Sequence, residues 1–443
     1  MKDRSITYRQ LLNLLFLLVF LSSSFDIFLN LKLGGFSFRF VYIIVILLFV
    51  ISVADMIWKN TIHIKVLGII PFLAWSLILI IFIPNTPLLA RNIGYIVWLY
   101  IHFIFIAVCG NFIVTKKHVN QIIKLYLFSF LAVALFGLLQ FSLALVGISI
   151  LVEQWWILGR LARINGFSYE PSYYTTYLLI GFSLAYYLFR REINLFGRLP
   201  FYTAAVSLTA IILSTSRMGI LVAALQVLCF ELIVNRKNLI QLLLFVVGFS
   251  VVLGGTIIYI INNAEFGFLL SGLGIMGGSD HSSAERLDGL LTQLTIFGRN
   301  PLKGYSLGGV SQAIAFEKGV VSISQETIKP YDISMNIFVE VLTASGLIGF
   351  LFFLRYIYCL LIKSTLATKQ KSYNNSTYIL LKAFVWSLLF ELIILCFNQS
   401  ILRAYLWVHI GLLNGIYFVV KTQNTEKFEL QTQESNLNNG TND

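Results

Sequence analysis

Four polar segments interrupt an otherwise apolar chain, and each carries side chains that bind negative charge or exchange protons. The first covers residues 160–172 and contains Arg160, Arg163 and Glu170, of which Glu170 directly precedes Pro171. A guanidinium binds phosphate or carboxylate through two parallel hydrogen bonds, and a carboxylate accepts a proton from a hydroxyl group. The same residues also fit a capped helix end in which Glu170 complements the helix dipole, so both interpretations stay open.

The second and fourth segments place polar groups beside an arginine. Residues 214–219 contain Ser216 and Arg217 between two long apolar runs. A simple turn at a membrane surface does not require an arginine so closely flanked by apolar helix, and we therefore favour an anion-binding pocket. The fourth segment either coordinates an anionic ligand or caps a turn; its polar residues are Asn398, Gln399, Ser400 and Arg403.

The third segment has acidic and amide groups at a regular spacing. Asp332, Asn336 and Glu340 lie at positions i, i+4 and i+8, so a helix would carry all three on one face. If Asp332 is at the surface, the rise of ~1.5 Å per residue places Glu340 roughly 12 Å deeper. An unpaired carboxylate is costly at that depth, and we expect an arginine partner. That pair would serve either catalysis or the packing of two helices.

The composition requires a lipid environment for these segments. Of 443 residues, 58% are apolar and only 12% are charged, which leaves more apolar surface than a water-soluble domain can bury. The net charge of +12 does not indicate nucleic-acid binding, because Lys and Arg lie mostly in short loops between apolar runs. We predict an all-α membrane bundle.

A helix needs ~20 apolar residues to cross the ~30 Å hydrocarbon layer, and about twelve runs meet that requirement. They lie near residues 10–30, 38–58, 64–84, 92–114, 122–150, 171–190, 199–216, 218–235, 238–262, 333–363, 377–396 and 399–420. Nine spans would thus fall within residues 1–262 and three within residues 333–420. Residues 1–20 lack the small-x-small cleavage site of a signal peptide and are interpreted as part of the first span.

The basic residues predict the orientation of these spans. Alternate connections are rich in Lys and Arg, as cytoplasmic loops are, which places both termini in the cytoplasm. The opposite, outer side carries twelve basic residues over a larger area, and eight of them are arginines: Arg39, Arg91, Arg160, Arg163, Arg217, Arg286, Arg299 and Arg403. Any single arginine can be a snorkelling side chain at a helix end, whereas the set favours binding of phosphate or carboxylate on that side.

One outer connection, residues 263–332, is long enough to form an element outside the membrane. Ser282 and Glu285 have the spacing of a capping box, so a helix should begin there. Gly298 and Pro301 should end it. We expect this helix to lie over the mouth of the bundle, with an apolar face made of Leu287, Leu290, Leu291 and Leu294.

Other features of the chain predict no site. The histidines are scattered, and the cysteines lie inside apolar runs without zinc spacing, so we predict neither a metal site nor a disulfide framework. The GxGxxG string at residues 272–277 follows no βαβ strand and does not indicate a nucleotide site. The polar tail, residues 421–443, is predicted to be a disordered cytoplasmic segment.

Four ordered motifs between residues 160 and 350 carry a family resemblance. They are Arg163, Gly166 and Phe167 with Glu170-Pro171-Ser172; Ser216-Arg217-Met218-Gly219; Arg286 with Asn300-Pro301-Leu302-Lys303-Gly304-Tyr305; and Asn336 with Gly346-Leu347-Ile348-Gly349. In this order they resemble the superfamily of bacterial O-antigen polymerases and O-antigen ligases. Ligase members typically carry a histidine before the asparagine, where this chain has Met335, so the resemblance favours a repeat-unit polymerase.

The resemblance implies a multi-pass protein of the bacterial inner membrane that transfers sugars on the periplasmic face, in O-antigen or capsule biosynthesis. The donor would be an undecaprenyl-pyrophosphate-linked oligosaccharide and the acceptor a lipid-linked glycan, with no metal, other cofactor or nucleotide sugar. The leaving pyrophosphate would be bound by Arg163, Arg217, Arg286 and Arg403, helped by Arg160, Ser216 and Asn336. Asp332, Glu340 or Glu170 would take the proton from the attacking hydroxyl or orient it, and direct displacement would invert the anomeric centre.

Two other functions stay open. A ligase would transfer finished glycan to lipid A core or another acceptor, and the missing histidine argues against it. A flippase or other transporter of lipid-linked sugars agrees with about twelve spans, but no internal repeat is evident and the long outer connection would be unexplained. The resemblance also implies a separate chain-length regulator protein as a partner.

Overall fold

The fold is known from a computed structural model of the chain. It describes residues 2–439 except 34–35, 61–63, 158, 160, 193, 235–279, 333–335, 370–375 and 398–399, with only residues 247, 248, 255 and 258 placed between 235 and 279. The predicted ninth span, residues 238–262, and the GxGxxG string lie outside the described residues.

Helices dominate the described chain, as the sequence predicts. The first half contains α1 (Lys2–Ser22), α2 (Phe40–Trp58), α3 (Ile69–Ile81), α4 (Leu89–Phe112), α5 (Lys116–Leu145), α6 (Pro171–Arg190), α7 (Leu199–Ser214) and α8 (Arg217–Val234). The second contains α11 (Asp280–Arg299), α12 (Val310–Glu317), α13 (Ile337–Tyr358), the π-helical turn η6 (Cys359–Lys363), α14 (Ser364–Ala367), α15 (Ser376–Ile394) and α16 (Ala404–Asn439). The described residues also form two short antiparallel hairpins, which join β1 (Asn30–Leu33) to β2 (Phe36–Arg39) and β3 (Gln154–Ile157) to β4 (Leu161–Arg163).

Helix α16 forms the centre of the bundle. It packs against α4 and α15, and its Trp407, Leu412 and Ile416 are almost completely buried. Asn414 supplies polar partners inside this apolar packing: its side chain donates to the carbonyls of Lys65 and Ile106 and accepts from the N–H of Leu67. Because buried backbone groups are costly when unpaired, this one amide holds the irregular chain before α3 against the core.

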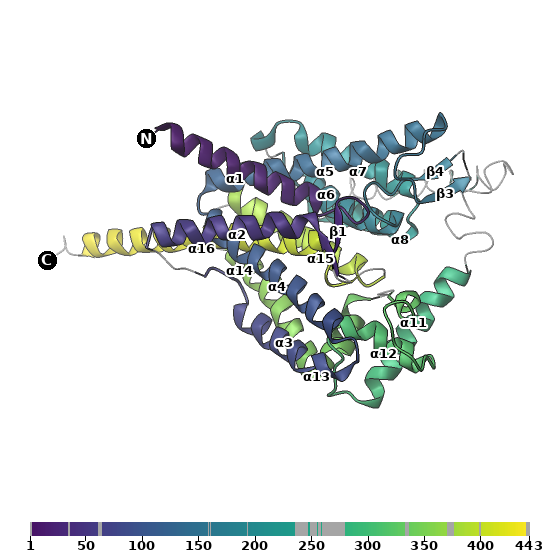
Figure 1. Cartoon of the computed structure of the whole chain (residues 1–443). Helices are drawn as coiled ribbons and strands as arrows, with labels where there is room; N and C mark the ends of the chain where they lie inside the picture. The colour runs from purple at the N-terminus through teal and green to yellow at the C-terminus, as the bar shows by residue number, and fades with distance from the viewer. Residues whose placement is uncertain are drawn as a thin grey trace.

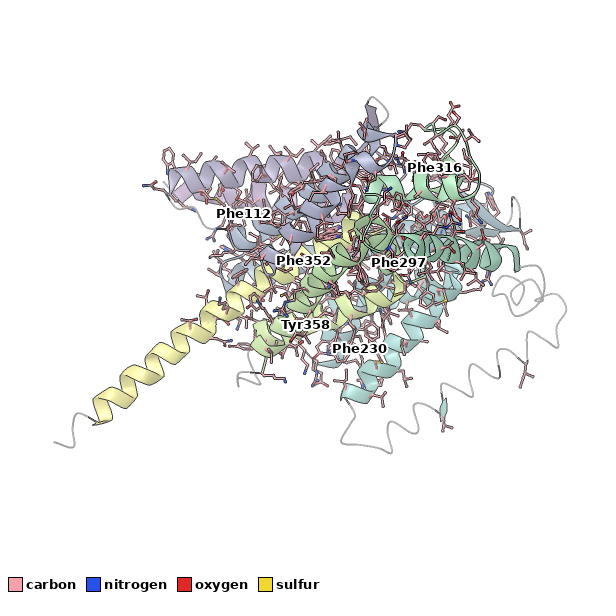
Figure 2. All side chains as sticks on the ribbon, turned by 90° about the horizontal axis from the view of Figure 1, so that it is seen from below. Phe112, Phe230, Phe297, Phe316, Phe352 and Tyr358 are labelled. Carbon is pink, nitrogen blue, oxygen red and sulfur yellow. The ribbon has the colours of Figure 1, made fainter. Side chains whose placement is uncertain are left out.

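Among the described residues, six helices are long and apolar enough to cross a membrane: Phe40–Trp58, Leu89–Phe112, Lys116–Leu145, Ile337–Ala367, Ser376–Ile394 and Ala404–Thr425. Shorter apolar helices cover Tyr8–Ser22, Ile69–Asn85 and Leu199–Ser214. Large apolar side chains stay exposed on the bundle, among them Val50 and Ile70, and Figure 2 labels two more, Phe352 and Tyr358 of α13. The protein is therefore an all-α polytopic membrane protein, whereas the number of twelve spans stays a prediction.

The two ends of the bundle carry different parts of the chain. Both termini lie at one end, here called the terminal end, and β3, β4, α11 and α12 lie at the opposite one, here called the outer end (Figure 1). Helix α6 begins at the outer end with Pro171 in its first turn, where the missing proline N–H has no helical partner to lose. The predicted boundary at residue 171 is therefore confirmed.

A break in α13 receives the loop that precedes α12. Gly346 has φ +63, a conformation that side chains with a Cβ rarely adopt, and a Cβ there would lie 2.9 Å from the carbonyl oxygen of Leu302. Backbone groups beside the break pair with the loop: the N–H of Leu347 donates to the carbonyl of Pro301, and the N–H of Ser306 donates to the carbonyl of Ala344. The Asn-Pro-Leu-Lys-Gly segment and Gly346 thus form one docking joint.

Two predictions about flanking segments are wrong. Helix α11 is present and ends at Arg299 as predicted, but Leu287, Leu291 and Leu294 are exposed and its buried face carries Thr292, Gln293 and Ile296. Packing against α12 and α13 determines which face of α11 is buried, and the local spacing of apolar residues does not determine that packing. The tail after Lys421 continues helix α16 to Asn439 instead of being disordered. Its Glu, Gln, Lys and Leu residues have good helix propensity, and extending an existing helix requires no new nucleus.

Candidate functional site at the outer end

A buried carboxylate, Asp26, joins two arginines at the outer end. Arg39 lies 3.0 Å from its Oδ1, and Arg403 donates to its Oδ2 at 2.8 Å. The Asp26 side chain is 4% exposed, and those of Arg39 and Arg403 are 22% and 12% exposed. Two cations facing one anion leave a net positive charge in a poorly hydrated position, which favours an anionic ligand.

Local structure holds Asp26 in place. Helix α1 ends at Ser22, earlier than the predicted residue 30, and the hydroxyls of Ser23 and Ser24 donate to carbonyls of its last turn. The chain then turns, and the N–H of Asp26 donates to the carbonyl of Phe167 at 3.0 Å. The ring of Phe167 in turn stacks on Phe136 with 4.2 Å between centroids.

The motif that begins at Arg163 therefore positions Asp26 through its phenylalanine. Gly166 has φ +55, and a Cβ there would meet the ring of Tyr174 at 2.5 Å, so glycine is required. The N–H groups of Asn165 and Gly166 both donate to Gln140. Two of the family-like residues, Gly166 and Phe167, hence act as structural supports.

Arg403 connects this carboxylate to the start of α6. Its guanidinium carbon lies 3.8 Å from the ring centroid of Tyr173, a close cation–π contact. Burial by itself lowers the pKa of Arg403, but the attraction of Asp26, joined by Tyr405, Tyr173 and Glu170, outweighs it and the pKa lies above its ordinary value. Arg403 is therefore a permanent cation whose Nε has no hydrogen-bond partner among the described residues.

The turn between α7 and α8 is anchored by Arg163. Its Nε donates to Thr215 Oγ1 at 2.7 Å and its Nη1 to Gln154 Oε1 at 2.9 Å. Ser216 is buried, and its N–H donates to Ser214. Arg217 is exposed, and its side chain has no hydrogen bond or ion pair to any other described residue. Arg163 thus holds the turn, and Arg217 is the cation that this turn presents to the surroundings.

Glu170 lies beside this turn, at the N-terminus of α6. Its Oε2 accepts from the hydroxyl of Ser172 at 2.9 Å, and the carboxylate is partly exposed. Below it, Thr175 hydrogen-bonds with Ser214, and Gly219 packs directly on the Thr175 methyl group. The first turn of α6 is therefore fixed against the α7–α8 turn, which brings Glu170, Arg163 and the Arg217 backbone into one region.

A second cluster surrounds Arg91 in α4. Arg91 forms a salt bridge with Asp332 and also donates to Tyr95 and Ser311. Asp332 follows the short helix Lys329–Tyr331, and its side chain is 36% exposed. These residues line a cavity of about 60 Å³ together with Glu340 and Ser400. That volume has room for a few water molecules but not for a sugar ring.

Glu340 has a structural role in this cluster. Its carboxylate is buried and accepts from the hydroxyl of Ser400 at 3.0 Å and from the N–H of Ile401 at 2.9 Å. It thereby ties α13 to the turn that carries Arg403. The prediction that Asp332, Asn336 and Glu340 share one helix face is wrong, because α13 begins at Ile337 and only Glu340 lies within it.

Asn336 is the N-cap of α13. Its Oδ1 accepts from the N–H groups of Phe338 and Val339, and its Nδ2 donates to the carbonyl of Cys396. These bonds use both ends of the side-chain amide. Asn336 therefore acts as a helix cap, which satisfies N–H groups that have no helical partner, and its role in substrate binding stays a prediction.

Some predicted site residues are not described. Arg160, Asn398, Gln399 and Met335 lie outside the described residues, and the side chain of Arg286, within α11, does too. The structure also brings Asp26 into the site, a residue that lies inside the first predicted span, residues 10–30. An acidic residue within an apolar run is itself a signal for a buried ion pair.

The comparisons with known proteins agree with the ordered motifs. Residues 202–354 match the family model described as O-antigen ligase, which confirms the resemblance to the O-antigen polymerase and ligase superfamily. No curated protein matches the chain. The matched segment contains Arg217, Asp332 and Glu340, whereas Asp26, Arg163 and Arg403 lie outside it. The match supports a function of the O-antigen polymerase or ligase type, which is a glycosyl transfer.

Proposed function

We propose that this chain is a polysaccharide repeat-unit polymerase that transfers an undecaprenyl-pyrophosphate-linked glycan to a lipid-linked acceptor. The observation that carries the proposal is the gathering of arginines and carboxylates at the outer end, beside and within the segment that matches the family. The chain would lie in the bacterial inner membrane with both termini in the cytoplasm, so that this end faces the periplasm. The alternate connections that are rich in Lys and Arg support that orientation, because cytoplasmic loops are enriched in these residues.

Arg217 is the first candidate to bind the pyrophosphate. It is exposed and unpaired among the described residues, and the bond from Arg163 to Thr215 fixes the turn that carries it. Negative charge grows on the pyrophosphate as the glycosidic bond breaks, and a preorganised guanidinium stabilises that charge without reorganisation at the moment of reaction. Arg403 and Arg39 extend the positive potential around Asp26.

Glu170 is the carboxylate that the geometry favours for the acceptor hydroxyl. It is partly exposed, it lies next to the α7–α8 turn, and its detected partner is the hydroxyl of Ser172. Glu340 is buried and already accepts two hydrogen bonds, and Asp332 is paired with Arg91. A general base needs a free lone pair within hydrogen-bond reach of the attacking hydroxyl, and Glu170 meets that requirement best.

Reconstitution of the purified full chain with a lipid-linked repeat unit, without added metal, tests the proposal. A polymerase produces dimers and longer lipid-linked products in a ladder. If the repeat unit remains unchanged under conditions in which the protein is folded, the polymerase proposal is abandoned.

A ligase is the second candidate, because the matching family model carries that description. The two are distinguished in a strain that lacks the chain. Loss of a polymerase leaves single-repeat glycans on the final acceptor, whereas loss of a ligase leaves long polymer that is unattached. Short glycans in the deletion strain would therefore support the polymerase, and free polymer would support the ligase.

A further inference from the structure

A cavity lies away from the arginine cluster, where α13 and α16 approach the terminal end. Its volume is about 500 Å³, within the range of ligand-binding pockets, ~300–1,000 Å³. Its walls come from the chain that precedes α3, from the end of α13 with η6, and from α16. The lining residues used below are Ile70, Phe352, Arg355, Lys363, Phe418 and Lys421.

Three cations converge on this cavity from two helices. Arg355 and Lys363 lie on α13 and η6, and Lys421 lies on α16. None of the three forms a salt bridge with a described residue, and all three side chains are exposed. The π-helical turn widens the helix at Lys363, a distortion that often occurs at functional positions.

The backbone adds to this positive potential. Helix α3 begins at Ile69, and its N-cap residue, Gly68, has no side chain that accepts from the first-turn N–H groups. Gly68, Ile69 and Ile70 all line the cavity. The positive end of the helix dipole therefore lies beside the same space as the three cations.

The apolar part of the wall continues onto the membrane-facing surface. Ile70 is 77% exposed and Phe352, labelled in Figure 2, is 37% exposed, although both lie in apolar helices. The spans that carry the cations, Ile337–Ala367 and Ala404–Thr425, end close to Lys363 and Lys421. A cation cluster at the ends of spans lies at the depth of lipid headgroups, with the apolar wall at the depth of acyl chains.

We propose that this cavity binds one anionic phospholipid of the adjoining leaflet, with its phosphate among Arg355, Lys363 and Lys421 and an acyl chain along Ile70, Phe352 and Phe418. A soluble phosphate would use the cations but not the apolar wall, and a zwitterionic lipid would use the wall but leave the cations unneutralised. The proposal depends on the protein lying in a membrane and is independent of its catalytic activity.

Binding is measured on the purified, delipidated full chain by native mass spectrometry and by the thermal unfolding midpoint. The probes are phosphatidylglycerol, phosphatidylcholine and inorganic phosphate. We expect phosphatidylglycerol to form one retained adduct and to raise the midpoint. Equal effects of phosphatidylcholine or of inorganic phosphate would overturn the proposal.

The cations are tested by the variant R355Q/K363Q/K421Q, which should bind phosphatidylglycerol at least about tenfold more weakly. The matched control is K116Q/K117Q/K124Q, which removes the same charge from exposed positions of α5 that do not line the cavity. Should the triple variant fail to fold, the single variants K363Q and K421Q must each weaken binding. Unchanged affinity in these variants, or an equal loss in the control, contradicts the proposed site.

Discussion

Asp26 accepts a hydrogen bond from Arg403 at 2.8 Å, although 377 positions of sequence separate the two residues. The contact fastens the turn after α1 to the turn before α16, and Arg39 completes the buried group from the start of α2. The first and last helices of the bundle are therefore connected at the outer end by one carboxylate. Its removal should affect both the fold and the site.

The variant Asp26→Asn should lower the free energy of unfolding by about 3–5 kcal/mol, because it leaves two poorly hydrated arginines without their anion. Thermal unfolding of the purified protein in detergent measures the loss. The control is Asp55→Asn, which removes a salt bridge with Lys59 whose side chains are 28% and 60% exposed. That exposed pair should contribute less than about 1 kcal/mol, and similar losses in both variants would contradict the role of Asp26.

The joint between the outer loop and α13 predicts a second stability difference. Gly346→Ala forces a Cβ into a positive φ and against the carbonyl of Leu302, which should cost about 1–3 kcal/mol. Gly298→Ala, near the end of α11, meets no atom within 4 Å and should be neutral or slightly stabilising. Unfolding midpoints of the two variants check this prediction, which fails if Gly346→Ala is as stable as the original chain.

Local sequence signals predict the elements of this fold well. Pro171 marks the start of α6, and the polar residues from Ser214 to Arg217 mark the turn between α7 and α8. Such positions are readable because proline and clustered hydroxyls change the backbone where they stand. The long apolar runs likewise predict membrane helices, since each must satisfy its own backbone in lipid.

The partners of the site residues could not be predicted in the same way. Arg403 pairs with Asp26 and stacks on Tyr173, residues from three distant segments that only the packing of the bundle brings together. The helical spacing of Asp332 and Glu340 indicates a shared face, yet Asp332 ends the short helix Lys329–Tyr331 and the N-cap Asn336 separates it from α13, which carries Glu340. Periodicity describes a helix that has formed and does not fix where it begins.

The stacking of Arg403 on Tyr173 predicts a measurable coupling. Tyr173→Phe keeps the ring and should preserve most of the stability, whereas Tyr173→Leu removes the π face and should cost about 0.5–2 kcal/mol. A double-mutant cycle of Tyr173→Leu with Arg403→Met isolates the contact from its neighbours. A coupling energy of zero in that cycle would show that the guanidinium gains nothing from the ring.

The buried carboxylate of Glu340 predicts a structural effect of a nearly isosteric change. Glu340→Gln replaces one acceptor oxygen by an NH₂ group, which then faces Ser400 or the N–H of Ile401. We expect a loss of about 1–3 kcal/mol, since the Ser400 hydroxyl must change from donor to acceptor and the bonds to a charged carboxylate become weaker bonds to a neutral amide. Asp332→Asn should cost less because that side chain is 36% exposed. Equal unfolding midpoints for the two variants would contradict this assignment.

Substitutions of Arg217 and of Arg163 should differ in their effects on activity and on the unfolding midpoint. Arg217→Ala removes an exposed cation with no detected partner, so we expect an unchanged unfolding midpoint and a fall in polymer formation of about 100-fold or more. Arg217→Lys should fail similarly, because a point charge does not reproduce the planar fork. Arg163→Ala also releases Thr215 and Gln154 and should lower both activity and the midpoint.

The control is Arg198→Ala, which changes an exposed arginine before α7 and should leave both activity and the midpoint unchanged. Normal chain length from the folded Arg217→Ala protein would contradict the proposed role of this guanidinium in binding the lipid pyrophosphate.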